Sequence, residues 1–438
     1  MTVNSRFVAG RIYRVPHLNP LDAFFVRYLD LILISAGLML FLSGIYLFIR
    51  WKSPGGRAEL FSGGAVDYES EAAGTRAFDL FLISFLVLFM ELAFIRWIPA
   101  YVRLLSYFSN FILLACFLGF GLGCLMSRRR GNLLAVTPAA VFMIVAVTII
   151  LHITTALNLF LFTAGDIGAK ETVYFGNTFF FAPPSPKLPM EIVISFVFVA
   201  IAVAFMGPGQ ILGRTMSQFQ PIRAYAINIC GSIAGILAFL LIAFLEVPAP
   251  AWFLLGFLGI LWFLRKQKKK HLVVQGAILA AGLCFASFID RPPAEKVRTL
   301  WSPYYKVAYW HPRIAVNETG HQTMLSTNHP DGRYYSLPYL LQKAATGKGL
   351  DSALIIGAGS GNDVAHALLN GVKEIDAVEI DPVIQRIGTT SHPDRPYSDK
   401  KVKGIIDDGR SFLRKTDKKY DVVVYALVDS LTLLSTYS

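Results

Sequence analysis

Long apolar runs fill the first two thirds of the chain and leave that part few ways to fold. A helix of about 20 apolar residues crosses the roughly 30 Å hydrocarbon core of a bilayer. The chain therefore predicts a polytopic helical membrane domain over residues 1–289, with seven or eight helices, of which the last two are short. The predicted spans are 31–49, 78–100, 108–126, 133–156, 192–212, 226–245, 251–264 and 272–288.

Charge is scarce and unevenly placed. Charged residues make up 16% of the 438-residue chain, against about 25% in soluble domains, which excludes an ordinary soluble enzyme or a disordered chain. The net charge is +12, and residues 1–289 hold 22 basic against 12 acidic side chains. Basic residues beside apolar runs are typical of membrane topology, so we expect a lipid bilayer as partner and no nucleic acid. The four cysteines lie inside apolar runs without a CxxC motif, and we expect no metal.

Two ionisable residues, Glu91 and Arg96, lie inside the predicted span 78–100. Such residues are costly at membrane depth and face protein or water. One interpretation is that Arg96 extends to the interface and Glu91 pairs with a neighbour; the other is a polar substrate or proton site. Gly231 and Gly235 are four residues apart, a spacing that favours close helix packing over a lipid or ligand cleft.

The composition changes at residue 290. The short segments KVAYWH and QTMLST predict strands, and we assign residues 290–340 to a small β-hairpin region. A strand over 352–357, a turn with three glycines and a helix from residue 363 follow, and then a second strand over 374–381. Strand, glycine turn, helix and strand form the first half of a doubly wound nucleotide-binding unit.

The glycine turn contains Gly357, Gly359 and Gly361. Glycine adopts backbone conformations that a Cβ forbids and lets a ligand approach the main chain, and the following helix start offers free N–H groups. Glu379, at the end of the second strand, can accept hydrogen bonds from both ribose hydroxyls. The sequence therefore favours a nucleoside site over a turn that only packs helix on strand. It disfavours NAD(P), because Asn362 stands where GxGxxG requires its last glycine.

A third strand is predicted over 402–406 and ends in Asp407 and Asp408. An acidic side chain at this place suits the amino group of adenine, which is a hydrogen-bond donor. A solvated turn is the alternative interpretation of the two aspartates. A fourth strand is predicted over 420–427.

At this point the residues carry a family resemblance. The segments SPYYKV, DSALIIGAGSGNDV, AVEIDPVI, IIDDGRSFL and YDVVVYALVD resemble spermidine synthases, which are aminopropyltransferases with the class I methyltransferase fold. The segments ELAFIRWIPAYVRLLSYFSNF and RAYAINICGSIAGI are similar to the membrane parts of membrane-fused spermidine synthase-like proteins. The resemblance implies an α/β Rossmann-like domain over 341–438, S-adenosylmethionine or its decarboxylated form as co-substrate, and a polyamine as small-molecule acceptor.

The resemblance also assigns roles to individual residues. It implies that the glycine turn would cradle the S-adenosyl group, that Glu379 would hold the ribose, and that Asp407 and Asp408 would meet the adenine. The acceptor-side candidates are Tyr304, Asp331 and Tyr335, and the catalytic candidate is Asp429.

Three positions depart from the family's pattern. Ser360 stands where the family has an acid, Tyr305 where it has a glutamine, and Ala426 where it has the aspartate that orients and deprotonates the amine. A polyamine must lose a proton before it attacks, so these changes weaken the amine half of the site. A methyltransferase, a transporter with a nucleoside-sensing domain and a non-catalytic scaffold stay open beside aminopropyl transfer, and so does a homo-oligomer.

Members of this family continue through three more strands, so we expect the α/β domain to be truncated after its fourth strand. The positive-inside rule places the basic residues 128–130 and 265–270 in the cytoplasm. Eight full spans would then put the C-terminal domain outside, although the expected co-substrate is cytosolic. We therefore predict that 272–288 does not cross fully, and that the C-terminal domain of this inner- or plasma-membrane protein is cytoplasmic.

Overall fold

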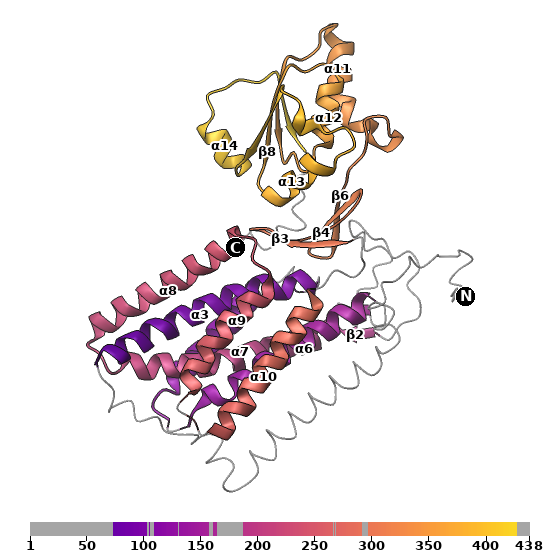
Figure 1. Cartoon of the computed structure of the whole chain (residues 1–438). Coiled ribbons are helices and arrows are strands. Elements are labelled where there is room, and N and C mark those ends of the chain that lie inside the picture. Colours follow the sequence, from indigo (N-terminus) through magenta and orange to yellow (C-terminus); the bar gives the residue numbers. More distant parts are fainter. Residues whose placement is uncertain are drawn as a thin grey trace, which may run out of the picture.

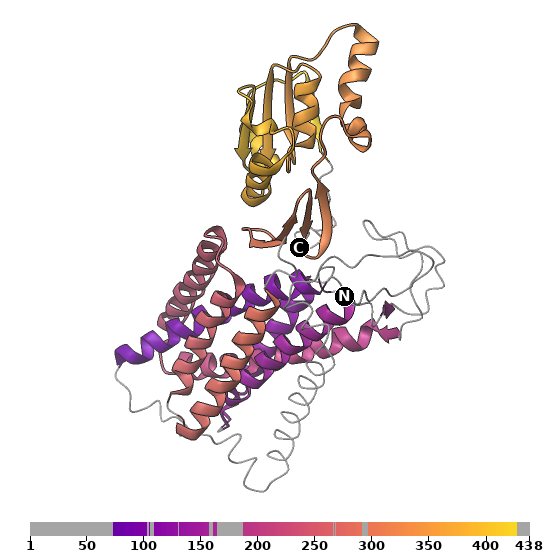
Figure 2. The same ribbon diagram turned by 45° about the vertical axis from the view of Figure 1, so that its right-hand side comes forward.

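The computed structural model describes residues 73–102, 105, 109–129, 131–156, 161–163, 187–265, 267, 269–290 and 297–426. Figures 1 and 2 show the same order of parts from two sides: a helical bundle, a small antiparallel sheet, and an α/β domain. The predicted span 31–49 and the catalytic candidate Asp429 lie outside the described residues.

Apolar helices build the bundle. Five of those described are long and apolar enough to cross a membrane, and α5 and α9 are shorter apolar helices. The short strands β1 and β2 pair in parallel at one end of the bundle. The elements are α3 (Ala73–Tyr101), α5 (Ser109–Leu125), η2 (Leu133–Ala135), α6 (Thr137–Ala156), β1 (Leu161–Thr163), β2 (Lys187–Pro189), α7 (Met190–Met216), α8 (Pro221–Phe244), α9 (Ala249–Leu264) and α10 (Lys269–Ile289).

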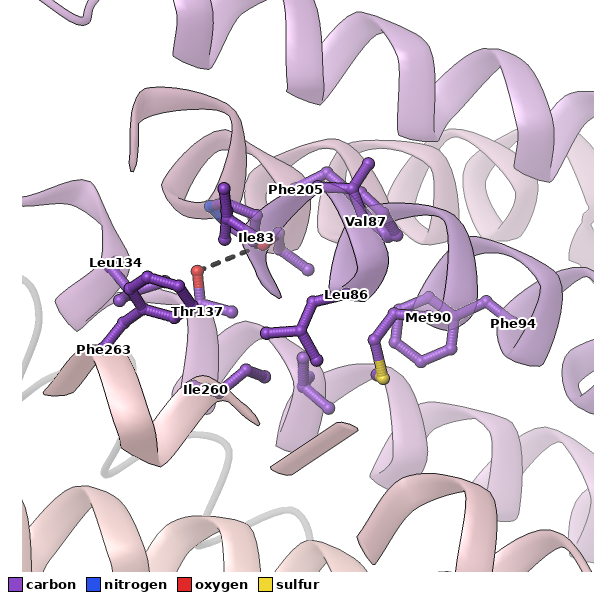
Figure 3. A pocket seen from close by; sticks show the side chains of 13 residues that line it. Ile83, Leu86, Val87, Met90, Phe94, Leu134, Thr137, Phe205, Ile260 and Phe263 are labelled. Atoms are coloured by element: carbon purple, nitrogen blue, oxygen red, sulfur yellow. Dashed lines mark hydrogen bonds between the residues drawn. The ribbon is translucent and has the colours of Figure 1, made fainter. Parts of the chain in front are cut away.

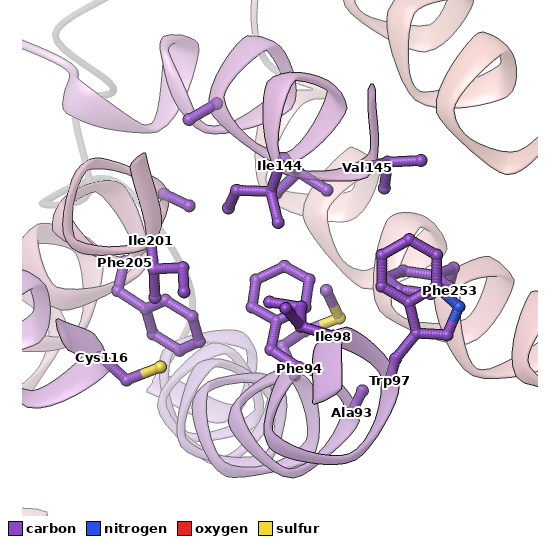
Figure 4. Packing of buried hydrophobic residues seen from close by; sticks show 14 of the residues in the cluster. Ala93, Phe94, Trp97, Ile98, Cys116, Ile144, Val145, Ile201, Phe205 and Phe253 are labelled. Carbon is purple, nitrogen blue, oxygen red and sulfur yellow. The ribbon is translucent and has the colours of Figure 1, made fainter. Parts of the chain in front are cut away.

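Helix α3 runs through the core of the bundle (Figure 4). Its Trp97 meets Phe253 of α9 edge to face, with 5.0 Å between the ring centroids. Phe94, one turn earlier, meets Phe205 of α7 at 5.9 Å. Such T-shaped aromatic pairs add about 0.5–1.5 kcal/mol to the burial of their surface, so they hold α3 between its neighbours.

Two glycines bring α8 against α3. A Cβ on Gly231 would lie 2.4 Å from the carbonyl oxygen of Phe81, and one on Gly235 would lie 2.4 Å from that of Phe85. Both distances are far below a van der Waals contact, so only glycine allows this approach of the two helices. The packing interpretation of the glycine pair is confirmed.

The small sheet lies between the bundle and the α/β domain (Figures 1 and 2). Its strands pair in sequence order and antiparallel, which confirms that hairpins follow the last helix of the bundle. Its buried face carries Val307, Ile314 and Val316, which pack against the α/β helix α13. The strands are β3 (Arg298–Trp301), β4 (Lys306–Trp310), β5 (Arg313–Val316) and β6 (Thr319–Thr323).

The hairpin region ends earlier than the sequence predicted. Strand β6 stops at Thr323, and the 3₁₀ helix η3 (Pro330–Ser336) leads into α11 (Leu337–Thr346). Both helical segments have a proline in their first turn, where its missing N–H costs nothing. Gly347, with φ 72°, ends α11 in the left-handed conformation that glycine adopts freely.

The α/β domain is built on a parallel sheet with the order β10-β7-β8-β9, so the four predicted strands are confirmed. Because the strands are parallel, the chain leaves all four at one edge of the sheet. Its elements are β7 (Ser352–Ile356), α12 (Asn362–Leu369), β8 (Glu374–Glu379), α13 (Pro382–Ser391), η4 (Pro396–Ser398), β9 (Val402–Ile406), α14 (Gly409–Lys415) and β10 (Val422–Tyr425).

Helix α10 is longer than the predicted segment 272–288. It has 21 residues, which span about 31 Å at 1.5 Å per residue, enough to cross a bilayer. Gln275 near its start donates to the carbonyl of Ala135, and Asp290 just after its end accepts from Tyr101 Oη. The helix therefore runs the length of the bundle, and the premise that it is too short was wrong.

Arg129, Arg214 and Lys269 lie at the end of the bundle away from the α/β domain, whereas Arg96 lies at the near end. Arg214 donates to the carbonyls of Arg129 and Gly131, and Gln210 ties the same turn to the start of η2. Helix α10 begins at this end with Lys269. If the bundle spans a bilayer, the two predictions of cytoplasmic basic loops and a cytoplasmic C-terminal domain exclude each other.

Candidate functional site

The glycine turn joins β7 to α12 at the carboxyl edge of the parallel sheet. Gly357, Gly359 and Gly361 have φ values of 75°, 56° and 105°, a region that L residues with a Cβ rarely adopt. A Cβ on Gly359 would also lie 2.2 Å from Nε2 of Gln322. The glycines are thus required by the backbone path and by the side chain that lies over the turn.

Protein groups hold the middle of this turn in place. Gly359 N donates to Glu379 Oε2 at 2.7 Å, and Tyr397 Oη donates to the carbonyl of Gly359 at 2.8 Å. The next amide, of Ser360, donates to Gln322 Oε1 at 2.8 Å. Sequence reasoning missed Gln322, because no local signal tells that β6 of the small sheet reaches the turn.

Glu379 has a structural role that its position at the end of β8 did not reveal. Its Oε1 accepts from the backbone N of Asp381 at 2.9 Å, so both carboxylate oxygens hold main-chain amides. The side chain is 6% exposed, and this burial raises its pKa above the ordinary value. Each carboxylate oxygen has a second lone pair, so these bonds leave acceptor capacity for a ligand.

The two aspartates after β9 have different surroundings. Asp408 is the N-cap of α14, where its Oδ1 accepts from Ser411 N at 2.8 Å. Asp407 pairs with Lys415 Nζ at 3.2 Å, and this hydrogen bond lowers the pKa of Asp407. The capping role therefore accounts for an aspartate at position 408 without any ligand. Asp407 lies beside the end of β8, because its backbone N–H donates to the carbonyl of Glu379 at 3.2 Å.

Tyr304 and Tyr305 have different surroundings: Tyr304 lies near the candidate site, and Tyr305 lies in an apolar core. Tyr304 is 39% exposed, and its pKa is raised by partial burial and by the nearby charges of Asp381, Asp408 and Asp407. Tyr305 is 9% exposed and belongs to the apolar cluster of the small sheet and α13. The residue in the family's glutamine position therefore packs in the core.

A cavity of about 1420 Å³ lies between the small sheet and the carboxyl edge of the parallel sheet. It brings together the glycine turn at Gly357, Asp331 and Tyr335 from η3, and Ala426 after β10. Glu379, Asp407, Asp408 and Tyr304 are not among the described residues that line it. The acceptor-side candidates Asp331 and Tyr335 thus share a wall with the turn, and Tyr304 instead accompanies the acids of the β8 and β9 ends.

Asn362 fixes one wall of the cavity. Its Nδ2 donates to the carbonyl of Thr323 and to Tyr335 Oη, and its Oδ1 accepts from Leu325 N and His392 Nε2. These bonds place Tyr335 against the start of α12. Burial and the neighbouring Tyr334 hydroxyl raise the pKa of Tyr335, so it is a neutral phenol at physiological pH.

Asp363 is a further lining residue that the sequence analysis did not select. It is the second residue of α12, and burial raises the pKa of its carboxyl to about 6. Its signal in the sequence was weak, because an acid in the first turn of a helix is common. Within the described residues, no group of three or more His, Cys, Asp or Glu could hold a metal ion.

Comparison with known proteins assigns this part of the chain. Residues 343–437 match the spermine/spermidine synthase domain. This part of the chain is spermidine synthase-like. The match contains β7, the glycine turn, Glu379, Asp407 and Asp408, while the helical bundle lies outside it.

The spermidine synthase-like domain has curated relatives named polyamine aminopropyltransferase. The one of Thermoplasma volcanium is 32% identical over 109 residues, which are 24% of this chain and 40% of that protein. The one of Korarchaeum cryptofilum is 33% identical over 82 residues, 18% of this chain and 26% of that protein. The one of Serratia proteamaculans is 37% identical over 82 residues, 18% and 29% respectively. The chain thus spans two fifths or less of the length of these relatives.

Proposed function

We propose that the protein is a membrane-bound transferase that moves an aminopropyl group from decarboxylated S-adenosylmethionine to a polyamine. The match of residues 343–437 to the spermine/spermidine synthase domain and the names of its relatives support the reaction class. The observation that carries the proposal is the cavity that Gly357 of the turn shares with Asp331 and Tyr335, because group transfer requires both reactants side by side.

The residues fit an S-adenosyl donor. Gly357 of the turn lines the cavity without a side chain, and Glu379 keeps acceptor capacity for ribose hydroxyls. Asp407 and Asp408 would meet the adenine amino group at the next strand end. The hydroxyl of Ser360 is buried without a hydrogen-bond partner in the described part of the chain, so a bound donor would satisfy it.

The donor supplies a carbon activated by the neighbouring sulfonium; the protein's part is to orient the amine and to take its proton. Asp363 and Asp331 are the carboxyl groups among the described lining residues. Asp363, with a pKa of about 6, is ionised at neutral pH and basic enough to accept a proton. We assign proton acceptance to Asp363, which compensates for Ala426, and binding of the distant ammonium group to Asp331.

A second candidate, methyl transfer from S-adenosylmethionine, is favoured by Ser360 and Ala426. Both stand where the family places acids, and a neutral Ser360 tolerates the donor carboxylate that decarboxylation removes. The full-length protein should be supplied with each donor and with putrescine in turn. We expect spermidine and methylthioadenosine from the decarboxylated donor. Formation of S-adenosylhomocysteine from S-adenosylmethionine would replace the aminopropyl assignment by methyl transfer. If the protein turns over neither donor, transferase activity is contradicted.

Ala426 offers a variant that sharpens this test. Ala426→Asp restores a carboxyl group at the end of β10, on the cavity wall. A positioned general base contributes typically about 10²–10⁴-fold to a rate, so we expect aminopropyl transfer to putrescine to rise. Val423→Asp, on the exposed side of β10, is the control. An unchanged or lower rate in Ala426→Asp would contradict this mapping of the fourth strand.

The membrane assignment rests on the bundle. Five helices are long and apolar enough to span a bilayer, so we propose an integral protein of the inner or plasma membrane. Because an S-adenosyl donor is made in the cytosol, the proposed reaction requires the α/β domain on the cytoplasmic side. This orientation places the basic end of the bundle outside the cytoplasm, which is contrary to the positive-inside rule. Reporter fusions at the two ends of the bundle test the orientation.

A further inference from the structure

A second cavity lies inside the helical bundle, remote from the glycine turn. Its volume is about 190 Å³, and helices α3, α5, α7 and α8 supply its walls. A water needs only roughly 10–15 Å³, so the space admits a ligand of several non-hydrogen atoms. Its polar lining residues are Ser84, Glu91, Asn228 and Ser232.

Glu91 is the ionisable group of this cavity. The side chain is 3% exposed, and it makes no hydrogen bond or ion pair with any residue that the structure describes. It is the 19th residue of the 29-residue helix α3, which places it about 6 Å from the middle of the helix. An unpaired carboxylate at that depth is strongly unfavourable, so a cation that enters the cavity is held there.

A neighbouring cavity in the bundle has an apolar lining, in contrast to the polar lining of the Glu91 cavity. It measures about 20 Å³ and is lined by apolar residues such as Ile83, Leu86 and Phe205 (Figure 3). The polar group of that cavity, the hydroxyl of Thr137, already donates to the carbonyl of Ala204 at 3.1 Å. The hydroxyl in that space is thus already satisfied, whereas the Glu91 cavity presents acceptors to a ligand.

We propose that the Glu91 cavity binds a small organic cation with a primary ammonium group. The carboxylate of Glu91 pairs with the ammonium, and the oxygens of Asn228 and Ser232 accept from its remaining N–H groups. Asn228 is held by Ser84, whose Oγ lies 2.9 Å from Asn228 Oδ1 and shares its proton between this oxygen and the carbonyl of Leu80 at 2.7 Å. This arrangement is independent of the proposed function, because it uses no residue of the α/β domain.

The remaining walls favour an alkylammonium over a metal ion. Phe117, Phe120 and Leu212 line the cavity and offer apolar surface to a carbon chain, and aromatic rings also attract a cation. Calcium or magnesium requires six or more oxygen ligands, which one carboxylate with an amide and hydroxyls does not provide. A ligand with an ammonium head and a short apolar stem matches both halves of the lining.

Binding of radiolabelled putrescine to the full-length protein in lipid nanodiscs, without any S-adenosyl donor, tests this proposal. We expect saturable binding that n-butylamine displaces and n-butanol does not. Glu91→Gln should weaken binding about tenfold or more, because it removes a charge-assisted pair. Asp79→Asn is the matched control: Asp79 lies buried on the same helix but outside the cavity, where it accepts from Trp262 Nε1.

Three outcomes would overturn the proposal: no saturable binding by the natural protein, equal binding by Glu91→Gln, or displacement by sodium chloride and not by butylamine. If Glu91→Gln fails to fold, Asn228→Ala removes a second ligand and should weaken binding several-fold. Loss of putrescine binding in Asp331→Asn would assign the amine to the α/β cavity and would likewise overturn it. Transferase turnover is measured separately, so failure of one proposal leaves the other standing.

Discussion

At the residue scale, Glu379 both stabilises the glycine turn and is the proposed ribose ligand. Its two oxygens accept the N–H groups of Gly359 and Asp381, and the proposed ribose contacts use the same carboxylate. A substitution of this residue cannot remove one role and keep the other. Substitutions at this position therefore change stability and affinity together.

We expect Glu379→Ala to lower both the thermal midpoint and the affinity for S-adenosyl donors. Leaving buried amides unsatisfied costs about 1–3 kcal/mol, and the lost charge-assisted acceptor costs roughly tenfold or more in affinity. Thermal melts and calorimetric titration of the full-length protein measure the two effects. Glu374→Ala, at the exposed start of the same strand, is the control. Unchanged affinity would contradict the ribose assignment.

Asp363 predicts a pH dependence of stability. Burial raises the pKa of this carboxyl from 3.8 to about 6 in the folded protein. The folded state therefore binds more protons than the unfolded state between these values, and stability falls as pH rises through this window. We expect Asp363→Asn to raise the thermal midpoint at pH 7 but not at pH 3.5, and to slow transfer. An equal gain at both pH values would contradict the burial of the charge.

At the element scale, one aspartate joins three elements where the bundle meets the small sheet. Asp290 Oδ1, just after α10, accepts from Tyr101 Oη of α3 and from Trp301 Nε1 of β3, both at 2.8 Å. Arg96 of α3 also donates to the carbonyl of Ser302, which follows β3. These bonds connect the small sheet, and with it Tyr304, to the end of the bundle.

Asp290→Ala should loosen this junction. Two buried donors, Tyr101 and Trp301, lose their acceptor, at a cost of about 1–3 kcal/mol, so we expect a lower thermal midpoint and faster amide hydrogen exchange in β3 and β4. Hydrogen exchange with mass spectrometry measures the local effect. Asp351→Ala, which removes only an exposed pair with Lys373, is the control. Equal exchange in both variants would show that the sheet does not depend on this joint.

At the scale of the whole molecule, orientation in the membrane decides whether the proposed reaction has a donor. The α/β domain and the basic residues Arg129, Arg214 and Lys269 lie at opposite ends of the bundle, so a bundle that spans the membrane as proposed permits one of them in the cytoplasm and not both. Asp290 marks the domain end, and Arg129, Arg214 and Lys269 mark the basic end.

We expect alkaline phosphatase fused after Asp290 to be inactive, because phosphatase folds only outside the cytoplasm and the proposed donor is cytosolic. A green fluorescent protein fused at the same place should be fluorescent. Fusions after Gly131, at the basic end, should give the opposite pattern. An active phosphatase after Asp290 would follow the positive-inside rule and would deprive the S-adenosyl proposal of its donor.

Patterns local in the chain determined the elements. Apolar runs predicted the described helices of the bundle, and strand, glycine turn and terminal acid predicted β7, β8 and β9, because burial and backbone conformation depend on nearby residues. The segment 330–346 was the exception, since its prolines start helices there and the short hairpin pattern does not extend that far. The positions of Gly357, Gly359 and Gly361 were likewise readable, because positive φ selects glycine wherever it occurs.

Contacts between distant elements were decided only by the tertiary structure. Gln322 lies over Gly359, Asp363 and Ala426 share a cavity, and Glu91 faces a polar space. Each of these contacts depends on how helices and sheets pack against one another, so it cannot be predicted from residues that are neighbours in the sequence. The opposition of the basic end and the α/β domain has the same origin, because it follows from α10 running the full length of the bundle. Sequence therefore determined what each segment forms, and packing determined which groups meet.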